Sequence, residues 1–314
     1  MKKIFLIFLI QIFFLNTNVY SNINKFKKGD ILSNEIKLSK KKFLTLPEGN
    51  WEVTYRSTEI VYGMKFSLIN LVKLKNNRIS EFLEIGFSNL AGKFVYYVDP
   101  IMTEVMFKNT HDGCYERPEY LVIELYRKGS SHNCFKIRHL ETVKELYNPD
   151  DKSTLGFLAS IKKYINDNNQ KNLPKIMLGS FHSYFSRTNG GDWYLISHLI
   201  NPKNINAPDS KFFTEESSEY HKYNIDNYPG HKEVMNKWIS FSAKRHLELE
   251  KLANANTNHK LNLEKYVLEN NDLDNSKQEN NINFIDQLNR LNDLFKSGSL
   301  SKEEFEKAKK KLLD

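Results

Sequence analysis

Between residues 43 and 140 the sequence contains a series of short segments rich in Val, Ile, Tyr and Phe. Turn-forming Gly, Asn, Asp and Pro residues separate them, and β-prone segments at this spacing predict an antiparallel meander. The predicted strands are 52–55, 65–75, 79–87, 93–98, 103–108, 119–127 and 134–139. Some of them do not alternate cleanly between apolar and polar residues, which indicates strands covered on both faces.

Two helices and a hairpin follow. The first helix begins after Asn148-Pro149-Asp150, and its apolar residues recur at helical spacing: Leu155, Leu158, Ile161 and Ile165. Strands 175–187 and 193–200 flank Asn189-Gly190-Gly191, which favours a tight turn. A second helix is predicted over 231–253, where Arg245 interrupts the apolar stripe as an edge residue or as a buried partner for an acid. We therefore expect an α+β fold over residues 43–253, an antiparallel β-sheet with two packed helices.

The N-terminus has the pattern of a signal peptide. Lys2 and Lys3 precede an apolar stretch over 4–15, and Val19 and Ser21 are small residues at the positions that a signal peptidase requires. This predicts cleavage after Ser21, so that 1–21 is removed and the protein is exported to the periplasm or cell envelope. An uncleaved membrane anchor is the alternative. Residues 22–42 are polar and lysine-rich, and we expect a leader outside the core.

Composition excludes several classes of protein. With 40% hydrophobic and 27% charged residues, the chain is neither collagenous, low in complexity nor a polytopic membrane protein. Its formal net charge of +8 is compatible with an anionic surface such as lipid headgroups or cell-wall polymers. The lysine content also fits the codon bias of an AT-rich genome. We expect no nucleic-acid partner and no cofactor.

The sequence predicts a separate module at the C-terminus. Residues 254–281 are rich in Asn and predict a mobile linker. Residues 282–314 then contain two short amphipathic helices, separated by Lys296-Ser297-Gly298. Ser301 and Glu304 have the spacing of a capping box, which begins the second helix. The apolar face that we expect to mediate oligomerisation comprises Leu288, Leu291, Phe295, Phe305 and Leu312.

The leucine spacing of this module, Gly298, Ser301, Glu303-Glu304-Phe305 and the segment 309–313 together resemble the short C-terminal domain family, SHOCT. The resemblance covers about a tenth of the chain. It implies a helical hairpin without catalytic residues that serves in oligomerisation or docking. A hairpin of this size buries little apolar surface by itself, so self-pairing or packing on a partner is also expected on physical grounds.

Cys114 and Cys134 are the two cysteines of the chain, and in an exported protein they predict a disulfide. His111 and His132 lie close to them in the sequence, so a tetrahedral zinc site with these four ligands is an alternative. Free thiols are a third. We expect no resident metal.

Further histidines form two candidate constellations. If the 175–187/193–200 hairpin pairs residues whose numbers add to 380, His182 faces His198 on one face of the sheet. The two could share a metal ion or change charge together between pH 5 and 8; the alternative is that they are plain surface residues. Glu116 and His139 form the one acid–base pair that we would test for catalysis.

The sequence contains no Gly-x-Ser-x-Gly, His-Glu-x-x-His, phosphate-binding glycine loop or dinucleotide-binding motif. We therefore expect a non-catalytic envelope protein that binds a partner or a small ligand. Its C-terminal hairpin would assemble with itself or with another envelope protein. A periplasmic hydrolase without a recognisable motif and a carrier of an apolar ligand are the alternatives.

Overall fold

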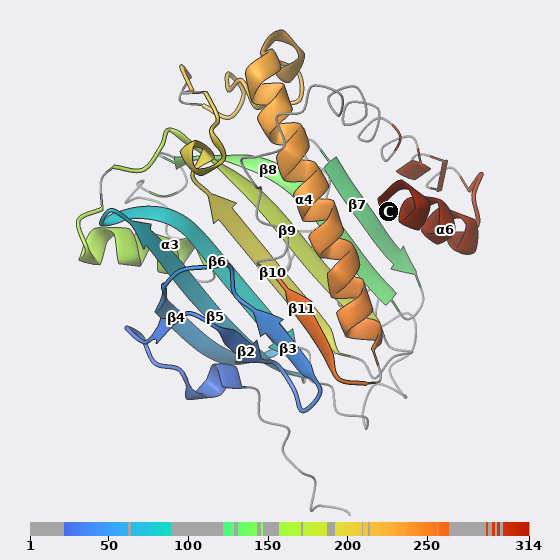
Figure 1. Ribbon diagram of the computed structural model, residues 1–314, viewed down its shortest axis with the longest axis horizontal. Coiled ribbons are helices and arrows are strands. Elements are labelled where there is room, and N and C mark those ends of the chain that lie inside the picture. Colours follow the sequence, from blue (N-terminus) through green and yellow to red (C-terminus); the bar gives the residue numbers. More distant parts are fainter. Residues whose placement is uncertain are drawn as a thin grey trace, which may run out of the picture.

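A computed structural model of the chain (Figure 1) describes residues 22–61, 64–88, 122–128, 131–142, 146, 157–170, 172–186, 192–208, 210–212, 214–255, 257–263, 287, 291–292, 294–295 and 298–313. The expected signal peptide and the predicted strands 93–98 and 103–108 lie outside these residues. So do His111, Cys114, Glu116 and Leu288.

The described part contains an antiparallel sheet of eight strands and a smaller sheet of three. The large sheet has the order β1-β4-β5-β6-β10-β9-β8-β7. In that order, its strands are Ile31–Leu32, Trp51–Val61, Met64–Lys75, Arg78–Ser88, Trp193–Ile200, Ile176–Ser186, Ser131–Glu141 and Val122–Lys128. The antiparallel sheet predicted from the sequence is therefore confirmed.

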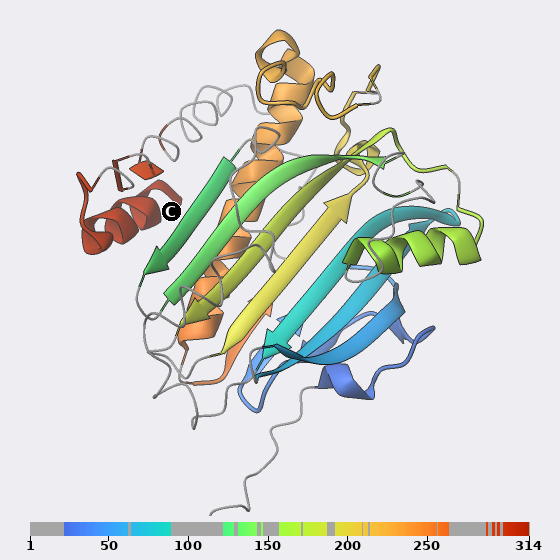
Figure 2. The ribbon, with the colours of Figure 1, turned by 180° about the vertical axis from the view of Figure 1, so that it is seen from behind.

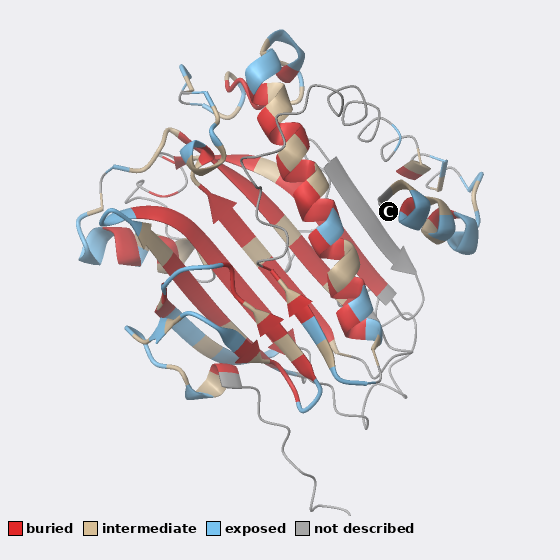
Figure 3. Ribbon diagram, viewed as in Figure 1, coloured by how far each residue is buried: buried red, intermediate tan, exposed pale blue. Residues whose placement is uncertain are grey.

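One helix packs on each face of this sheet (Figures 1 and 2). The long helix α4 (Pro229–Asn254) crosses one face diagonally, and its Trp238 and Met235 pack against Phe135 and Leu178 of the strands. The shorter α3 (Phe157–Asp167) covers part of the opposite face, where Ile161 joins a second apolar cluster. The sheet is thus buried from both sides over much of its length (Figure 3), which explains why the apolar pattern of its strands does not alternate.

The small sheet includes residues that were expected to lie outside the core. Its order is β11-β3-β2, with strands His259–Asn262, Lys42–Thr45 and Glu35–Lys37. Residues 22–42 are not an unpacked leader, because Ile23, Ile36 and Leu38 are almost fully buried against the large sheet. The predicted linker also begins later than residue 254, because β11 pairs with β3 in parallel and Leu261 is buried.

The beginning of the second C-terminal helix matches its predicted signals. The helix α6 is Lys302–Leu313. The amide of Ser301 donates to the Glu304 carboxylate over 2.9 Å, and the Glu304 amide donates to Ser301 Oγ over 3.3 Å, as a capping box requires. Gly298 has a φ of +77°, and its amide donates to the Phe295 carbonyl. The rings of Phe295 and Phe305 stack 4.5 Å apart between their centroids.

The described residues also contain three short 3-10 turns: η1 (Asn22–Lys25), η5 (Pro202–Ile205) and η6 (Ile225–Asn227). Among the residues that the structure describes, no helix combines the length and the apolar composition needed to cross a lipid bilayer.

Candidate functional site

The predicted histidine pair lies on one face of the sheet, beneath α4, but in a different register. His198 pairs with Ser180, and His182 pairs with Ile196. The numbers of two paired residues therefore add up to two less than predicted. Because side chains alternate with a period of two, a two-residue shift leaves both histidines on the same face while separating them along the strands. Both are buried, at 2% and 0% exposure, so they are not plain surface residues.

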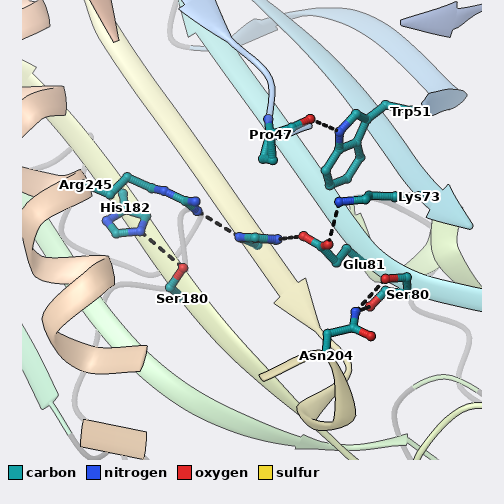
Figure 4. Close-up of polar contacts among 10 residues, drawn as sticks. Pro47, Trp51, Lys73, Ser80, Glu81, Ser180, His182, Asn204 and Arg245 are labelled. Carbon is teal, nitrogen blue, oxygen red and sulfur yellow. Dashed lines mark hydrogen bonds and ion pairs between the residues drawn. The ribbon is translucent and has the colours of Figure 1, made fainter. Parts of the chain in front are cut away.

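His198 stands in the middle of an interior series of polar and charged side chains that runs from Arg245 to the half-buried Lys73, both labelled in Figure 4. Arg245 of α4, fully buried, places its Nη1 2.8 Å from His198 Nδ1. On the other side of the ring, His198 Nε2 lies 2.8 Å from Glu81 Oε2 on β6. The second oxygen of Glu81 accepts from Lys73 Nζ on β5 at 3.0 Å. Four side chains from three strands and one helix thus form a continuous line through the core.

The charge of each side chain in this series follows from its hydrogen bonds and its burial. Burial alone would raise the pKa of Glu81, but hydrogen bonds from His198 and Lys73 and the positive charge of Lys73 lower it to about 2, so the carboxylate is ionised. Burial lowers the pKa of His198, and the ring is therefore a neutral imidazole that donates from Nε2 and accepts at Nδ1. Burial also lowers the pKa of Arg245, to about 9, which leaves it a cation at neutral pH. Nε and Nη2 of Arg245 have no hydrogen-bond partner in the described part of the chain.

A second polar group begins at His182 and ends at the C-terminal helix. His182 Nδ1 lies 3.4 Å from Nδ1 of His246 on α4, and Phe135 stacks against both rings with 5.3 Å between centroids. His246 Nε2 hydrogen-bonds Oδ1 of Asn133, whose amide nitrogen donates to Glu250. Burial lowers the pKa of both histidines well below 6.5, so we expect neutral rings at neutral pH rather than a paired charge change.

Lys309 of α6 is the far end of this group. Its Nζ lies 3.5 Å from Glu250 Oε1 of α4, and the residue is only 2% exposed. Leu312 packs against the same apolar cluster as α4, and Phe305 is 3% exposed. The described part of the face predicted for oligomerisation is therefore occupied in part by contacts within one chain. Leu291 is half-buried.

His132 and Cys134 are the members of the predicted cysteine–histidine site that lie within the described residues. His132 and Cys134 lie on the opposite face of β8 from Phe135, because alternate residues of a strand face opposite sides. Both are fully buried. Since Cys114 and His111 lie outside the described residues, the disulfide and the zinc site remain predictions. No group of three or more His, Cys, Asp or Glu residues that could hold a metal occurs within the described ranges.

His139 lies on the α4 face, where its Nε2 contacts the carbonyl oxygen of Glu215 at 2.9 Å. Its ring also meets the ring of His221 edge-on, with 5.8 Å between centroids. The acid–base pair with Glu116 remains a prediction, because Glu116 lies outside the described residues.

Sequence reasoning missed Glu81, His246, Asn133, Glu250 and Lys309 as members of the interior groups. A signal for Glu81 was present, because it shares a strand face with Leu83 and Ile85, where an apolar residue is expected. Arg245 was recognised as an interruption of an apolar helix stripe, and the structure places it in the core beside a histidine rather than directly beside an acid.

Two neighbouring pockets open near the end of the β5–β6 hairpin. The first, of about 450 Å³, is polar and basic, and the second, of about 340 Å³, is lined mainly by apolar side chains. Asn201 and Lys203 contribute to both. Neither pocket is lined by His182, His198 or His246.

Comparison with known proteins identifies the C-terminal segment alone. No curated protein and no solved structure matches the chain. The family model of the short C-terminal domain, SHOCT, matches residues 286–313, which bears out the resemblance seen in the sequence; the rest of the chain has no recognised family.

Proposed function

We propose that this chain is an exported, non-catalytic envelope protein that binds a partner or a small ligand. Its C-terminal hairpin provides a docking element. The observation that carries the proposal is the buried contact between Lys309 of α6 and Glu250 of α4. A SHOCT-like hairpin needs a surface to cover its apolar stripe, and α4 provides one in the same chain.

The contact has the character of a specific docking site. Lys309 is 2% exposed, whereas the neighbouring Lys310 and Lys311 are exposed. A buried ammonium group requires a negative partner, and Glu250 provides one for Lys309. Residues 264–286, which include most of the linker predicted over 254–281, connect the two parts. In this proposal the same contact can form within one chain or between two copies.

The buried histidines support a binding role over the hydrolase alternative. General acid–base catalysis requires a group within hydrogen-bond reach of the substrate. His182, His198 and His246 are at most 2% exposed and are bonded to other interior side chains. They line neither of the two pockets described above. In this proposal they keep the core polar groups paired.

The test compares the protein with three variants: a deletion of residues 282–314, Lys309→Glu and the matched control Lys310→Glu. Lys309→Glu places a carboxylate against Glu250 and is expected to release α6. We expect the deletion and Lys309→Glu to change the solution mass by light scattering or to lose partners in an envelope pull-down. Lys310→Glu should behave as the unmodified protein.

An unchanged assembly state together with unchanged partners in the deletion variant would contradict the docking role. For the apolar-ligand alternative, native mass spectrometry of the purified protein gives a separate answer. A co-purified apolar molecule would favour a carrier.

A further inference from the structure

The first pocket, here called the basic pocket, lies where the end of β5, the start of β6 and the η5 turn meet. It is lined by Lys75, Asn76, Arg78, Ile79, Ser80, Asn201, Lys203 and Asn204. Three of these side chains are cationic, four are amides or a hydroxyl, and none is a carboxylate. A volume of about 450 Å³ is in the range of small-molecule sites.

A β-bulge in β6 positions part of the lining of this pocket. Lys73 pairs with Glu81 but Leu74 pairs with Ile79, so Ser80 is the extra residue of a β-bulge. The Ser80 carbonyl accepts from the Asn201 amide at 3.0 Å and from Asn204 Nδ2 at 3.2 Å. The bulge thereby ties η5 to the sheet (Figure 4 shows Ser80 and Asn204). Bulges are frequent beside binding sites because they redirect side chains and backbone groups.

The hairpin turn sets the positions of two of the cations. Asn76 and Asn77 have φ values of 53° and 58°, as a two-residue turn of type I′ requires, and Lys75 and Arg78 pair directly across it. Both side chains are exposed, and neither forms an ion pair within the described ranges. Glu81, close to them along the strand, is bound inside the core by His198 and Lys73.

Asn201 adds an oriented donor. Its Oδ1 accepts from the Lys203 amide at 3.1 Å, so the side-chain amide is held with its oxygen toward the backbone. No described residue accepts from its Nδ2 group, which is left for a ligand. Cations on several sides and an oriented amide are the groups that proteins use to bind phosphoryl oxygens, and the arginine fork can bind two of them at once.

From this arrangement we infer that the basic pocket binds the phosphoryl group of an anionic ligand. The second pocket is lined in part by Leu173, Pro202 and Tyr220. Because Asn201 and Lys203 line both pockets, the two pockets adjoin, and the second accepts an apolar portion of the same molecule. The inference rests on the proposed binding function and gives it a ligand class. A free phosphate ester and a lipid headgroup both carry this chemistry.

The test uses isothermal titration calorimetry of the full chain in 150 mM NaCl, with inorganic phosphate and with phenyl phosphate, and co-sedimentation with vesicles of phosphatidylglycerol or phosphatidylcholine. The variant is Arg78→Gln/Lys203→Gln. The control, Lys25→Gln/Lys244→Gln, removes the same charge at exposed lysines that line neither pocket. Unfolding temperatures of both variants establish that they are folded.

We expect phosphate to bind, phenyl phosphate to bind more tightly, and the pocket variant to bind at least about tenfold more weakly while the control is unchanged. Binding of phosphatidylglycerol vesicles alone, lost in the pocket variant, would assign the phosphoryl group to a lipid. The absence of binding to every probe, or equal binding by the pocket variant, would overturn the inference. The deletion of 282–314 should leave phosphate binding intact, so failure of the pocket and failure of the docking role are distinguishable.

Discussion

Glu81 and Arg245 carry opposite charges inside the core and are joined through a single neutral imidazole. His198 lies 2.8 Å from Glu81 Oε2 on one side and 2.8 Å from Arg245 Nη1 on the other. The helix α4 and the strand β6, far apart in the sequence, are thereby linked by one continuous set of hydrogen bonds. A buried charge without a compensating partner is unfavourable, so the two ions depend on each other.

A double-mutant cycle measures this dependence. We expect Glu81→Gln to lower the free energy of unfolding by about 3–5 kcal/mol, because it leaves the Arg245 cation in the core without a counter-charge. Glu81→Gln/Arg245→Met should be more stable than Glu81→Gln alone. Urea unfolding of the single and double variants gives the interaction energy, and additive effects would show that the two charges are independent.

The buried Glu84, on the β6 face opposite Glu81, predicts a dependence of stability on pH. Burial, with a smaller contribution from Glu59, raises the pKa of Glu84 to about 8. The folded protein therefore keeps a proton that the unfolded chain releases near pH 4.5, and this group makes stability fall as pH rises from 4.5 to 8.

Glu84→Gln removes that dependence. Relative to the unmodified protein, its free energy of unfolding should improve by about 3 kcal/mol between pH 5 and pH 8. Urea unfolding at the two pH values is the measurement. An equal difference between the two proteins at both pH values would contradict a raised pKa.

The sheet leaves no room for a side chain at Gly86. A Cβ atom at this position would lie 2.6 Å from the Phe66 ring, which itself packs against Trp193 with 4.4 Å between ring centroids. We expect Gly86→Ala to destabilise the protein by about 1–3 kcal/mol. Gly86→Ala/Phe66→Leu should recover part of the loss, since the smaller side chain makes room. The measurement is the thermal unfolding of both variants. If the double variant is no more stable than Gly86→Ala, the strain does not come from the contact with Phe66.

Export and the disulfide have one common test. The intact mass of protein from the envelope fraction is expected to lack residues 1–21 and to be two hydrogens lighter than the reduced chain. Thiol labelling should then occur only after reduction. A full-length chain with two labelled thiols would contradict both predictions and would bring the zinc alternative with His111 and His132 forward.

The individual helices, strands and caps could be predicted from the sequence. The β-prone segments, the apolar stripe of the 231–253 helix, the glycine before Ser301 and the capping box depend on residues close together in the chain. The alternation of the hairpin also placed His182 and His198 on one face, even though the register was shifted by two residues. These features follow from backbone geometry and from contacts between residues close together in the sequence, so a short segment is enough to predict them.

Which charged side chains meet could be learned from the folded structure alone. Arg245 next to His198, Lys309 next to Glu250 and Ser80 next to Asn204 each join segments separated by long stretches of chain. The same is true of residues 22–42, where Ile23, Ile36 and Leu38 are buried because the large sheet provides a surface for them. Burial of a single isoleucine or arginine depends on the partner that folding brings to it, and no periodicity in the local sequence encodes that partner.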